Sequence, residues 1–143
     1  MKVQSSIIEN KYLRIKSINI GACLYEVFDK QKKINLILNL GHTKKYSSKN
    51  FYVGSTCGRY AGRISNSKFK IKKKTYKLDG NEGRNTLHGG KIGFDRLEWK
   101  IKHHSKTKII YQLLSKNLDQ GFPGDLNSEC IFEIKNKSLF IKY

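Results

Sequence analysis

The segment YLRIKSINI, residues 12–20, decides the fold class. Its apolar side chains alternate with polar ones, at Leu13, Ile15, Ile18 and Ile20. An alternation with period two is typical of a β-strand that buries one face. The alternation slips once, between Lys16 and Ser17, which predicts a β-bulge or a turn at that point.

Short runs of the same kind follow along the rest of the chain. They lie at residues 23–28, 34–40, 68–78, 97–104, 108–115, 130–136 and 139–143. The run at 68–78 is predicted to be a hairpin with a lysine-rich tip. Because no long segment has a helical period, the pattern predicts an all-β sandwich or barrel. Helix is expected only as a turn or two, around residues 57–63.

Length and charge limit the class of protein. A chain of 143 residues suits one domain, residues 1–143. Its net charge of +18 comes from 29 basic and 11 acidic residues. A polyanion partner such as nucleic acid is one interpretation. However, only five basic residues are Arg, the Lys are spread along the chain, and nucleic-acid sites favour Arg. Codon bias therefore explains the charge better, and we do not expect a nucleic-acid partner.

The cysteines and the N-terminal residues bear on location. The three cysteines, Cys23, Cys57 and Cys130, are far apart and form no CxxC motif. This spacing supports neither a zinc site nor a disulfide framework. Free thiols are typical of a reducing cytosol, so the expected location is cytoplasmic. No apolar stretch resembles a signal peptide or reaches the roughly 20 residues of a membrane span, so no membrane partner is expected.

Two segments combine glycines with polar side chains. GSTCGRYAGRISNSKF, residues 54–69, contains Arg59 and Arg63 among small residues. Arg can hold hydroxyl or carboxylate oxygens in a fixed geometry, although one of the two is expected to be satisfied by backbone carbonyls. NTLHGG, residues 85–90, places His88 before two glycines, where a ligand or another strand can approach closely.

The remaining histidines carry less information. His103 and His104 are adjacent in a predicted strand, so they point to opposite faces and are expected at the surface. His42 is expected to be solvated in a loop. No catalytic triad or metal site can be chosen from spacing alone.

The two polar segments together resemble the aldose 1-epimerase (galactose mutarotase) family. VGSTCGRYAGRISNSKF resembles the family's GRxANRI segment and the strand after it. IKKKTYKLDGNEGRNTLHGGKIGFDRLEW resembles its hairpin, its N…LHGG loop and the Gly-Phe and Trp downstream. SKNLDQGFPGDL resembles its DGEEGYPG turn, and LFIKY resembles the strand that follows.

The resemblance implies a fold and an activity. The fold is the N-terminal part of a large antiparallel β-sandwich, more than twice the length of this chain. The family interconverts the α and β anomers of free aldohexoses such as galactose and glucose, with an acid and a base but no cofactor and no metal. By the same resemblance, Arg63 and His88 are substrate-binding residues that contact sugar hydroxyls.

This sequence departs from the family pattern in several places. Gly62 replaces the Asn before the family's Arg, and Lys73 replaces the glycine at the hairpin tip. The family's acid His, base Glu and a sugar-binding Asp lie beyond the matched segments, so no catalytic residue is assigned here. The chain is therefore expected to be an incomplete domain, inactive alone, which a second polypeptide could complete. Its inner sheet faces and strand edges are expected to lack cover.

Two other functions are compatible with the composition. The first is a basic β-domain that binds nucleic acid, with Phe69, Tyr76, Trp99 and Tyr111 as stacking surfaces. The second is a carbohydrate-binding module that holds a sugar through Arg63 and His88 without turning it over.

Overall fold

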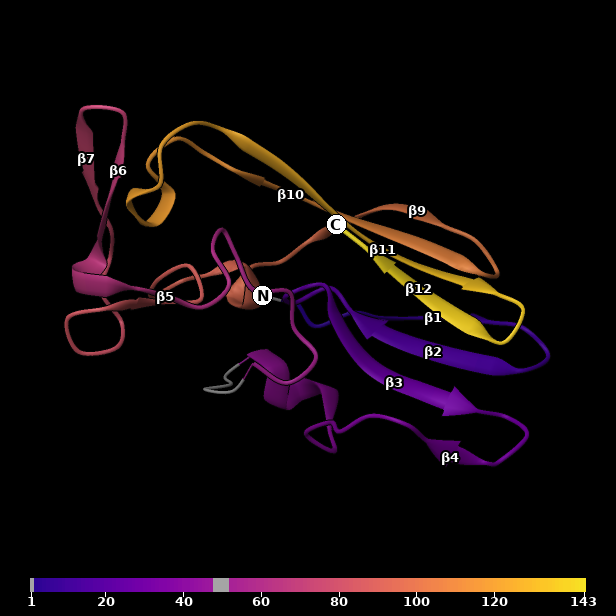
Figure 1. Cartoon of the computed structure of the whole chain (residues 1–143). Coiled ribbons are helices and arrows are strands. Elements are labelled where there is room, and N and C mark those ends of the chain that lie inside the picture. Colours follow the sequence, from indigo (N-terminus) through magenta and orange to yellow (C-terminus); the bar gives the residue numbers. More distant parts are fainter. Residues whose placement is uncertain (1, 48–51) are drawn as a thin grey trace.

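Two four-stranded antiparallel sheets face each other in the computed structural model, which describes residues 2–47 and 52–143 (Figure 1). The first sheet has the order β1-β2-β3-β4, with bounds Ser5–Glu9, Leu13–Ile18, Cys23–Asp29 and Ile34–Asn35. The second has the order β12-β11-β10-β9, with bounds Ser138–Lys142, Leu126–Lys135, Lys108–Ser115 and Lys100–His104. The predicted all-β sandwich is confirmed.

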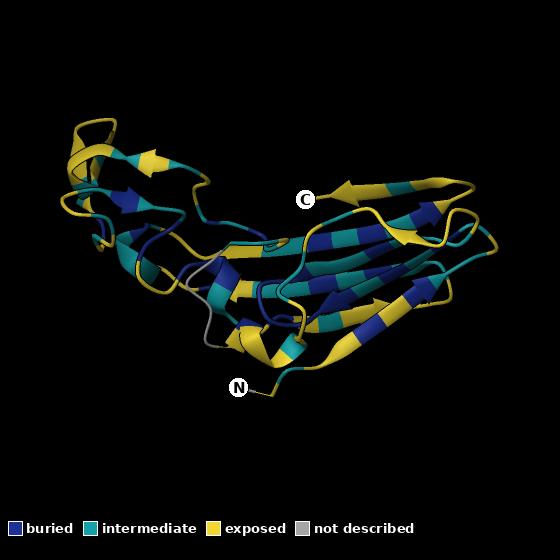
Figure 2. Ribbon diagram, turned by 90° about the horizontal axis from the view of Figure 1, so that it is seen from below, coloured by how far each residue is buried: buried dark blue, intermediate teal, exposed yellow. Residues whose placement is uncertain are grey.

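The core lies between these sheets because alternate side chains of each sheet point toward the other (Figure 2). The first sheet supplies Ile8, Leu13, Ile15 and Val27, and the second supplies Ile109, Tyr111, Cys130, Phe132 and Ile134. One buried polar contact also joins the layers, a 2.8 Å hydrogen bond between the Tyr111 hydroxyl and Ser17 Oγ. Burial raises the pKa of the Tyr111 phenol, which keeps it a neutral hydrogen-bonding group.

The slip in the opening segment is a β-bulge. Strand β2 pairs with β3 as Lys16↔Glu26 and then as Ser17↔Leu24, so β3 has one extra residue opposite this step. The bulge brings both Ser17 and Ile18 into buried positions. It therefore explains why the apolar alternation changes phase within one strand.

Two details of the predicted element map are wrong. The run at 34–40 forms only the two-residue strand β4, and Leu38 beyond it is 85% exposed. No helix forms at 57–63; the turns of 3-10 helix are η1 Thr43–Ser47, η2 Ser65–Ser67, η3 Phe94–Arg96 and η4 Asp119–Gly121. Gly62 adopts φ +108°, outside the helical region, which explains why the segment runs irregularly.

A separate part of the chain extends beyond one end of the sandwich (Figure 1). It contains two small sheets, made of β5 (Arg63–Ile64) with β8 (Thr86–Leu87) and of β6 (Lys68–Ile71) with β7 (Lys74–Lys77). The second pair confirms the predicted lysine-rich hairpin. Its positive φ falls at Lys72, +53°, so replacement of glycine by Lys73 brings no left-handed strain at that residue.

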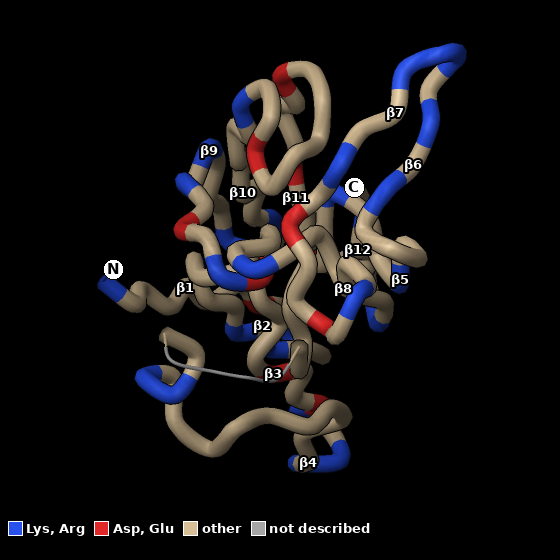
Figure 3. Tube along the Cα trace, turned by 90° about the vertical axis from the view of Figure 1, so that its left-hand side faces the viewer, with Lys and Arg blue, Asp and Glu red and all other residues tan. Residues whose placement is uncertain are grey.

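Basic residues lie on most elements and are dense on the β6–β7 hairpin (Figure 3). Of the four aromatic residues considered for base stacking, Trp99 is 2% exposed and Tyr111 is fully buried. Phe69 and Tyr76 stack on each other, with ring centroids 5.6 Å apart. The proposed stacking surface is therefore wrong for Trp99 and Tyr111, because both belong to the core.

Apolar surface remains at one edge of the sandwich. Strand β12 ends the second sheet, and Phe140 and Ile141 on it are 43% and 44% exposed. The expectation of an uncovered edge is confirmed, whereas over the core the inner faces cover each other. Within residues 2–47 and 52–143, no helix has the length and apolar character to cross a bilayer.

This edge leads to a prediction about self-association. The +18 charge keeps molecules apart at low salt, and salt near 0.1 M screens that repulsion beyond about 10 Å. We expect light scattering to show more self-association as salt rises, because exposed strand edges and apolar side chains can then meet. A Phe140→Lys, Ile141→Lys variant should stay monomeric. A wild-type chain that remains a monomer at all salt concentrations would contradict this prediction.

Candidate functional site

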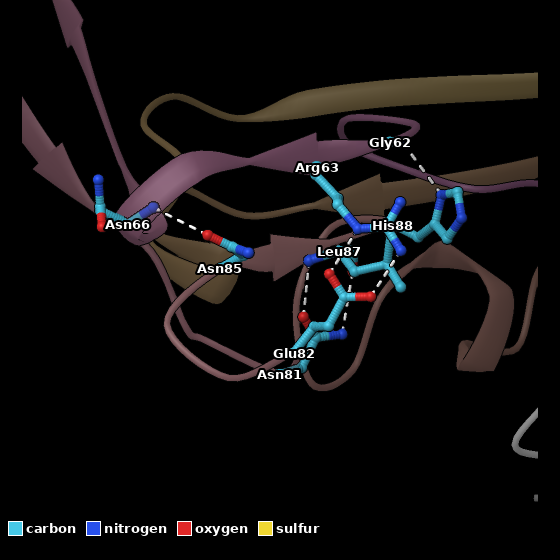
Figure 4. A network of polar contacts seen from close by, with 8 residues as sticks. All are labelled: Gly62, Arg63, Asn66, Asn81, Glu82, Asn85, Leu87 and His88. Carbon is cyan, nitrogen blue, oxygen red and sulfur yellow. Dashed lines mark hydrogen bonds and ion pairs between the residues drawn. The ribbon is translucent and has the colours of Figure 1, made fainter.

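The two glycine-rich segments meet in the extended part of the chain. Strands β5 and β8 pair Arg63 with Leu87 and Ile64 with Thr86. The His88 N–H also donates to the Gly62 carbonyl at 3.0 Å. Residues 58–63 and 85–90 therefore form one region, as the sequence predicted, and Arg63 and His88 lie on adjoining backbone positions (Figure 4).

The His88 ring is held from two sides. The Gly62 backbone N–H donates to His88 Nδ1 at 3.1 Å, and the Tyr52 ring lies 4.4 Å away between centroids. Because Nδ1 accepts this bond, the neutral imidazole carries its proton on Nε2. The ring therefore offers one N–H donor on its other side, suited to a hydroxyl or carbonyl oxygen.

The two glycines after His88 are required by the protein itself. Gly89 has φ +94°, and a Cβ there would lie 1.7 Å from the Gly58 carbonyl oxygen. Gly90 has φ +108°, and a Cβ there would lie 2.9 Å from Gln120 Oε1. The interpretation that these glycines make room for a ligand is therefore wrong; of the two options, the approach of another part of the chain is the correct one.

Arg63 forms a two-pronged ion pair that the sequence did not indicate. Its Nε lies 2.6 Å from Glu82 Oε2, and its Nη2 lies 2.7 Å from Glu82 Oε1. The hydrogen bonds from Arg63 hold the pKa of the Glu82 carboxyl below its ordinary value. Only the loop between β7 and β8 brings together two residues 19 positions apart, so no local motif could have revealed the pair.

The loop that carries Glu82 and His88 is fixed by side-chain amides. Asn81 Nδ2 donates to the carbonyls of Leu87 and Gly90, each at 2.9 Å, and Asn81 Oδ1 accepts from the Leu87 N–H at 2.7 Å. Asn85 Oδ1 accepts from the Asn66 N–H at 3.2 Å, which connects the loop to the turn after β5. These contacts hold the polar groups of the site in one arrangement (Figure 4).

Arg59, the other arginine of the first segment, has a structural role. Its guanidinium donates to the backbone carbonyls of Ser115, Lys116, Pro123 and Gly124, at 2.7–3.1 Å. Its Nε donates to Ser115 Oγ at 2.8 Å. The prediction that one of the two arginines is satisfied by carbonyls is confirmed. Arg59 joins the first glycine-rich segment to the loop between β10 and β11.

The histidines outside the site lie at the surface, as predicted. His42, His103 and His104 are all exposed. His104 Nε2 lies 2.9 Å from the Ile7 carbonyl oxygen, across to the edge of the first sheet. Among the described residues, no three His, Cys, Asp or Glu side chains come together as potential metal ligands.

The site can bind polar groups, but it is poorly equipped for proton transfer. A hollow of about 490 Å³ lies beside Arg63 and is lined by Arg59, Tyr60, Ile64, Phe69 and Phe122. Glu82 is the carboxylate nearest to Arg63 in the printed contacts, and its lowered pKa makes it a weak base. The described residues thus provide hydrogen-bond donors, from Arg63 and His88, rather than an acid and base pair.

The sandwich and its paired loops define a β protein of the galactose mutarotase-like class. It is similar to the crystal structure of a GalM/aldose epimerase homologue from C. elegans, with a TM-score of 0.85 and 27% identity, over 93% of this chain and 42% of that one. The aldose 1-epimerase family model matches residues 4–143. The chain belongs to the aldose 1-epimerase family.

Two characterised relatives show how much of a whole protein the chain represents. It is 31% identical to the galactose mutarotase of Sus scrofa over 144 residues, which are 99% of this chain and 42% of that protein. It is 36% identical to the aldose 1-epimerase of Escherichia coli over 92 residues, 64% of this chain and 27% of that protein. The chain therefore spans less than half the length of these relatives.

Proposed function

We propose that this chain supplies part of the sugar site of an aldose 1-epimerase, a protein that interconverts the α and β anomers of free aldohexoses such as galactose and glucose. The observation that carries the proposal is the β5–β8 pairing, which sets Arg63 and His88 side by side with N–H donors available. Sugar hydroxyls and the ring oxygen are hydrogen-bond acceptors that such donors fit.

Anomer exchange requires an acid that protonates the ring oxygen and a base that removes the C1 hydroxyl proton. The ring then opens, the C1–C2 bond rotates, and the ring closes on the other face. In this proposal Arg63 and His88 bind and orient the sugar, and neither transfers a proton. Family resemblance places the acid and base outside this chain, so the isolated chain is a binding half-site that needs no cofactor or metal.

We also propose that further polypeptide, equivalent to the part of the relatives that this chain does not match, completes the domain. Strand β12 pairs only with residues 131–135 of β11, so among the described strands residues 126–130 of β11 have β10 as their one neighbour. A hollow of about 530 Å³ adjoins this segment and includes Cys57, Trp99, Leu126 and Tyr143 in its lining. An added strand would fit there by edge pairing.

Polarimetry of freshly dissolved α-glucose tests the assignment of roles. The purified chain is expected to leave the rate of mutarotation equal to that in buffer, because it provides binding groups without the acid and base. Addition of the remainder of the Sus scrofa protein as a separate polypeptide is expected to raise the rate. A clear acceleration by the chain alone would contradict the proposal that it is a half-site.

Binding is tested separately by NMR titration with galactose. The signals of the Arg63 side chain and His88 ring are expected to shift at millimolar sugar, and His88→Ala should remove most of the effect. The matched control is His103→Ala, a change at an exposed histidine on β9. No shift at either site residue up to high sugar concentration would exclude sugar binding by this chain, including binding without turnover.

We further propose that the protein works in the cytoplasm. Its three cysteines are free, and Cys23 and Cys130 are buried. Burial raises the pKa of the Cys130 thiol to about 11, which keeps it unreactive. A set of unpaired thiols of this kind suits a reducing compartment.

A further inference from the structure

The ion pair between Arg63 and Glu82 uses both carboxylate oxygens but only part of the guanidinium. A guanidinium has five N–H donors. Glu82 takes one from Nε and one from Nη2, at 2.6 and 2.7 Å, which leaves three for other acceptors. Arg63 can therefore bind a hydroxyl oxygen without releasing Glu82.

Glu82 is held in place by its backbone as well as by its side chain. Its N–H donates to the Asn85 carbonyl at 3.1 Å, and the Asn85 N–H donates back to its carbonyl at 2.9 Å. The neighbouring Asn81 amide ties the same loop to Leu87 and Gly90 (Figure 4). Isolated surface ion pairs are weak, whereas this one has a two-pronged geometry on a fixed loop.

The pair changes what the site attracts. An unpaired arginine in a chain of net charge +18 would be a strong site for phosphate or carboxylate groups. With Glu82 in contact, the local charge of Arg63 is balanced. An anionic ligand would have to displace Glu82 or sit beside its negative charge, while a neutral hydroxylated ligand would do neither.

We propose that Glu82 is a specificity-determining residue, which reserves Arg63 for neutral hydroxyl-bearing ligands and excludes their phosphorylated or carboxylated counterparts. The ligand class in this statement rests on the proposed function. The exclusion of anions at Arg63 depends only on the ion pair and can be measured without any sugar.

The test is Glu82→Gln, which removes the charge and keeps the shape. Inorganic phosphate is titrated at constant ionic strength while the Arg63 Nε–H signal is followed by NMR. We expect binding at Arg63 to be on the order of fivefold tighter in Glu82→Gln than in the wild type. That factor corresponds to one unit charge at about 4 Å in water. Glu82→Asp, which keeps the charge, should restore weak binding.

The matched control is Glu26→Gln. Glu26 pairs with Arg14 at 2.9 Å on the sandwich, so this change alters the net charge equally but away from the site. Phosphate binding at Arg63 should stay at the wild-type level in this variant. Equal tightening in both variants, or none in Glu82→Gln with the fold intact by NMR, would overturn the proposal.

Parallel titrations with galactose and galacturonate separate this proposal from the proposed function. Glu82→Gln is expected to gain affinity for galacturonate while its response to galactose stays within about twofold of wild type, because one charge–charge contact is removed and the neutral contacts are kept. If galactose shifts nothing in any variant, the sugar assignment fails. The phosphate result then still decides whether Glu82 excludes anions from Arg63.

Discussion

Replacement of Gly89 by alanine is expected to unfold the chain or destabilise it by more than about 4 kcal/mol. The new Cβ would lie 1.7 Å from the Gly58 carbonyl oxygen and 2.4 Å from its carbon, and the backbone φ is +94°. Backbone atoms cannot move aside as a flexible side chain can, so the contact between the two segments of the site must open. Circular dichroism during urea denaturation measures the loss.

The matched control lies six residues earlier in the same loop. Gly83 has φ +55°, and a Cβ there would meet no atom within 4 Å. Gly83→Ala should therefore cost only about 1 kcal/mol, the ordinary penalty of a left-handed alanine. Similar losses for the two variants would show that the close packing of Gly89 against Gly58 does not hold in solution.

Replacement of Trp99 by alanine is the second large effect, with an expected loss of about 3–5 kcal/mol. Trp99 is 2% exposed and packs edge-to-face with Phe94, with ring centroids 5.7 Å apart. Its indole Nε1 donates to the Phe94 carbonyl at 3.0 Å. The substitution leaves a large cavity in the core and a buried carbonyl without its donor.

Tyr143→Ala provides the comparison for Trp99. Tyr143 is also a large aromatic residue of the second half of the chain, but it is 80% exposed. Its removal should change the free energy of unfolding by about 0.5 kcal/mol or less, as for most surface substitutions. If Trp99→Ala is tolerated as well as Tyr143→Ala, Trp99 does not anchor the core.

Much of the fold follows from local pattern. The alternation in β2, including its slip at Lys16–Ser17, and the hairpin at 68–78 were predictable because period-two burial and turn chemistry act over a few residues. The predictions were less accurate where tertiary context decides. The apolar run at 34–40 forms little strand, and β1 was not expected because Ser5–Glu9 is short. Its pairing with β2 stabilises it.

For the candidate site, the sequence by itself determined the residue types and, through motif resemblance, the family. It located Arg63 and His88, and it indicated that one of the two arginines of the first segment would be structural. It did not show which one, because the carbonyls that bind Arg59 lie 56 to 65 residues away.

Only the tertiary structure decided what each polar group contacts. It assigned Arg59 to the β10–β11 loop, paired Arg63 with Glu82, set the tautomer of His88 through Gly62, and gave Gly89 its reason in the Gly58 carbonyl. Hydrogen bonds and steric contacts act over about 3–4 Å between atoms. Residues far apart in the chain reach that range only when strands such as β5 and β8 pair, so sequence spacing cannot reveal these contacts.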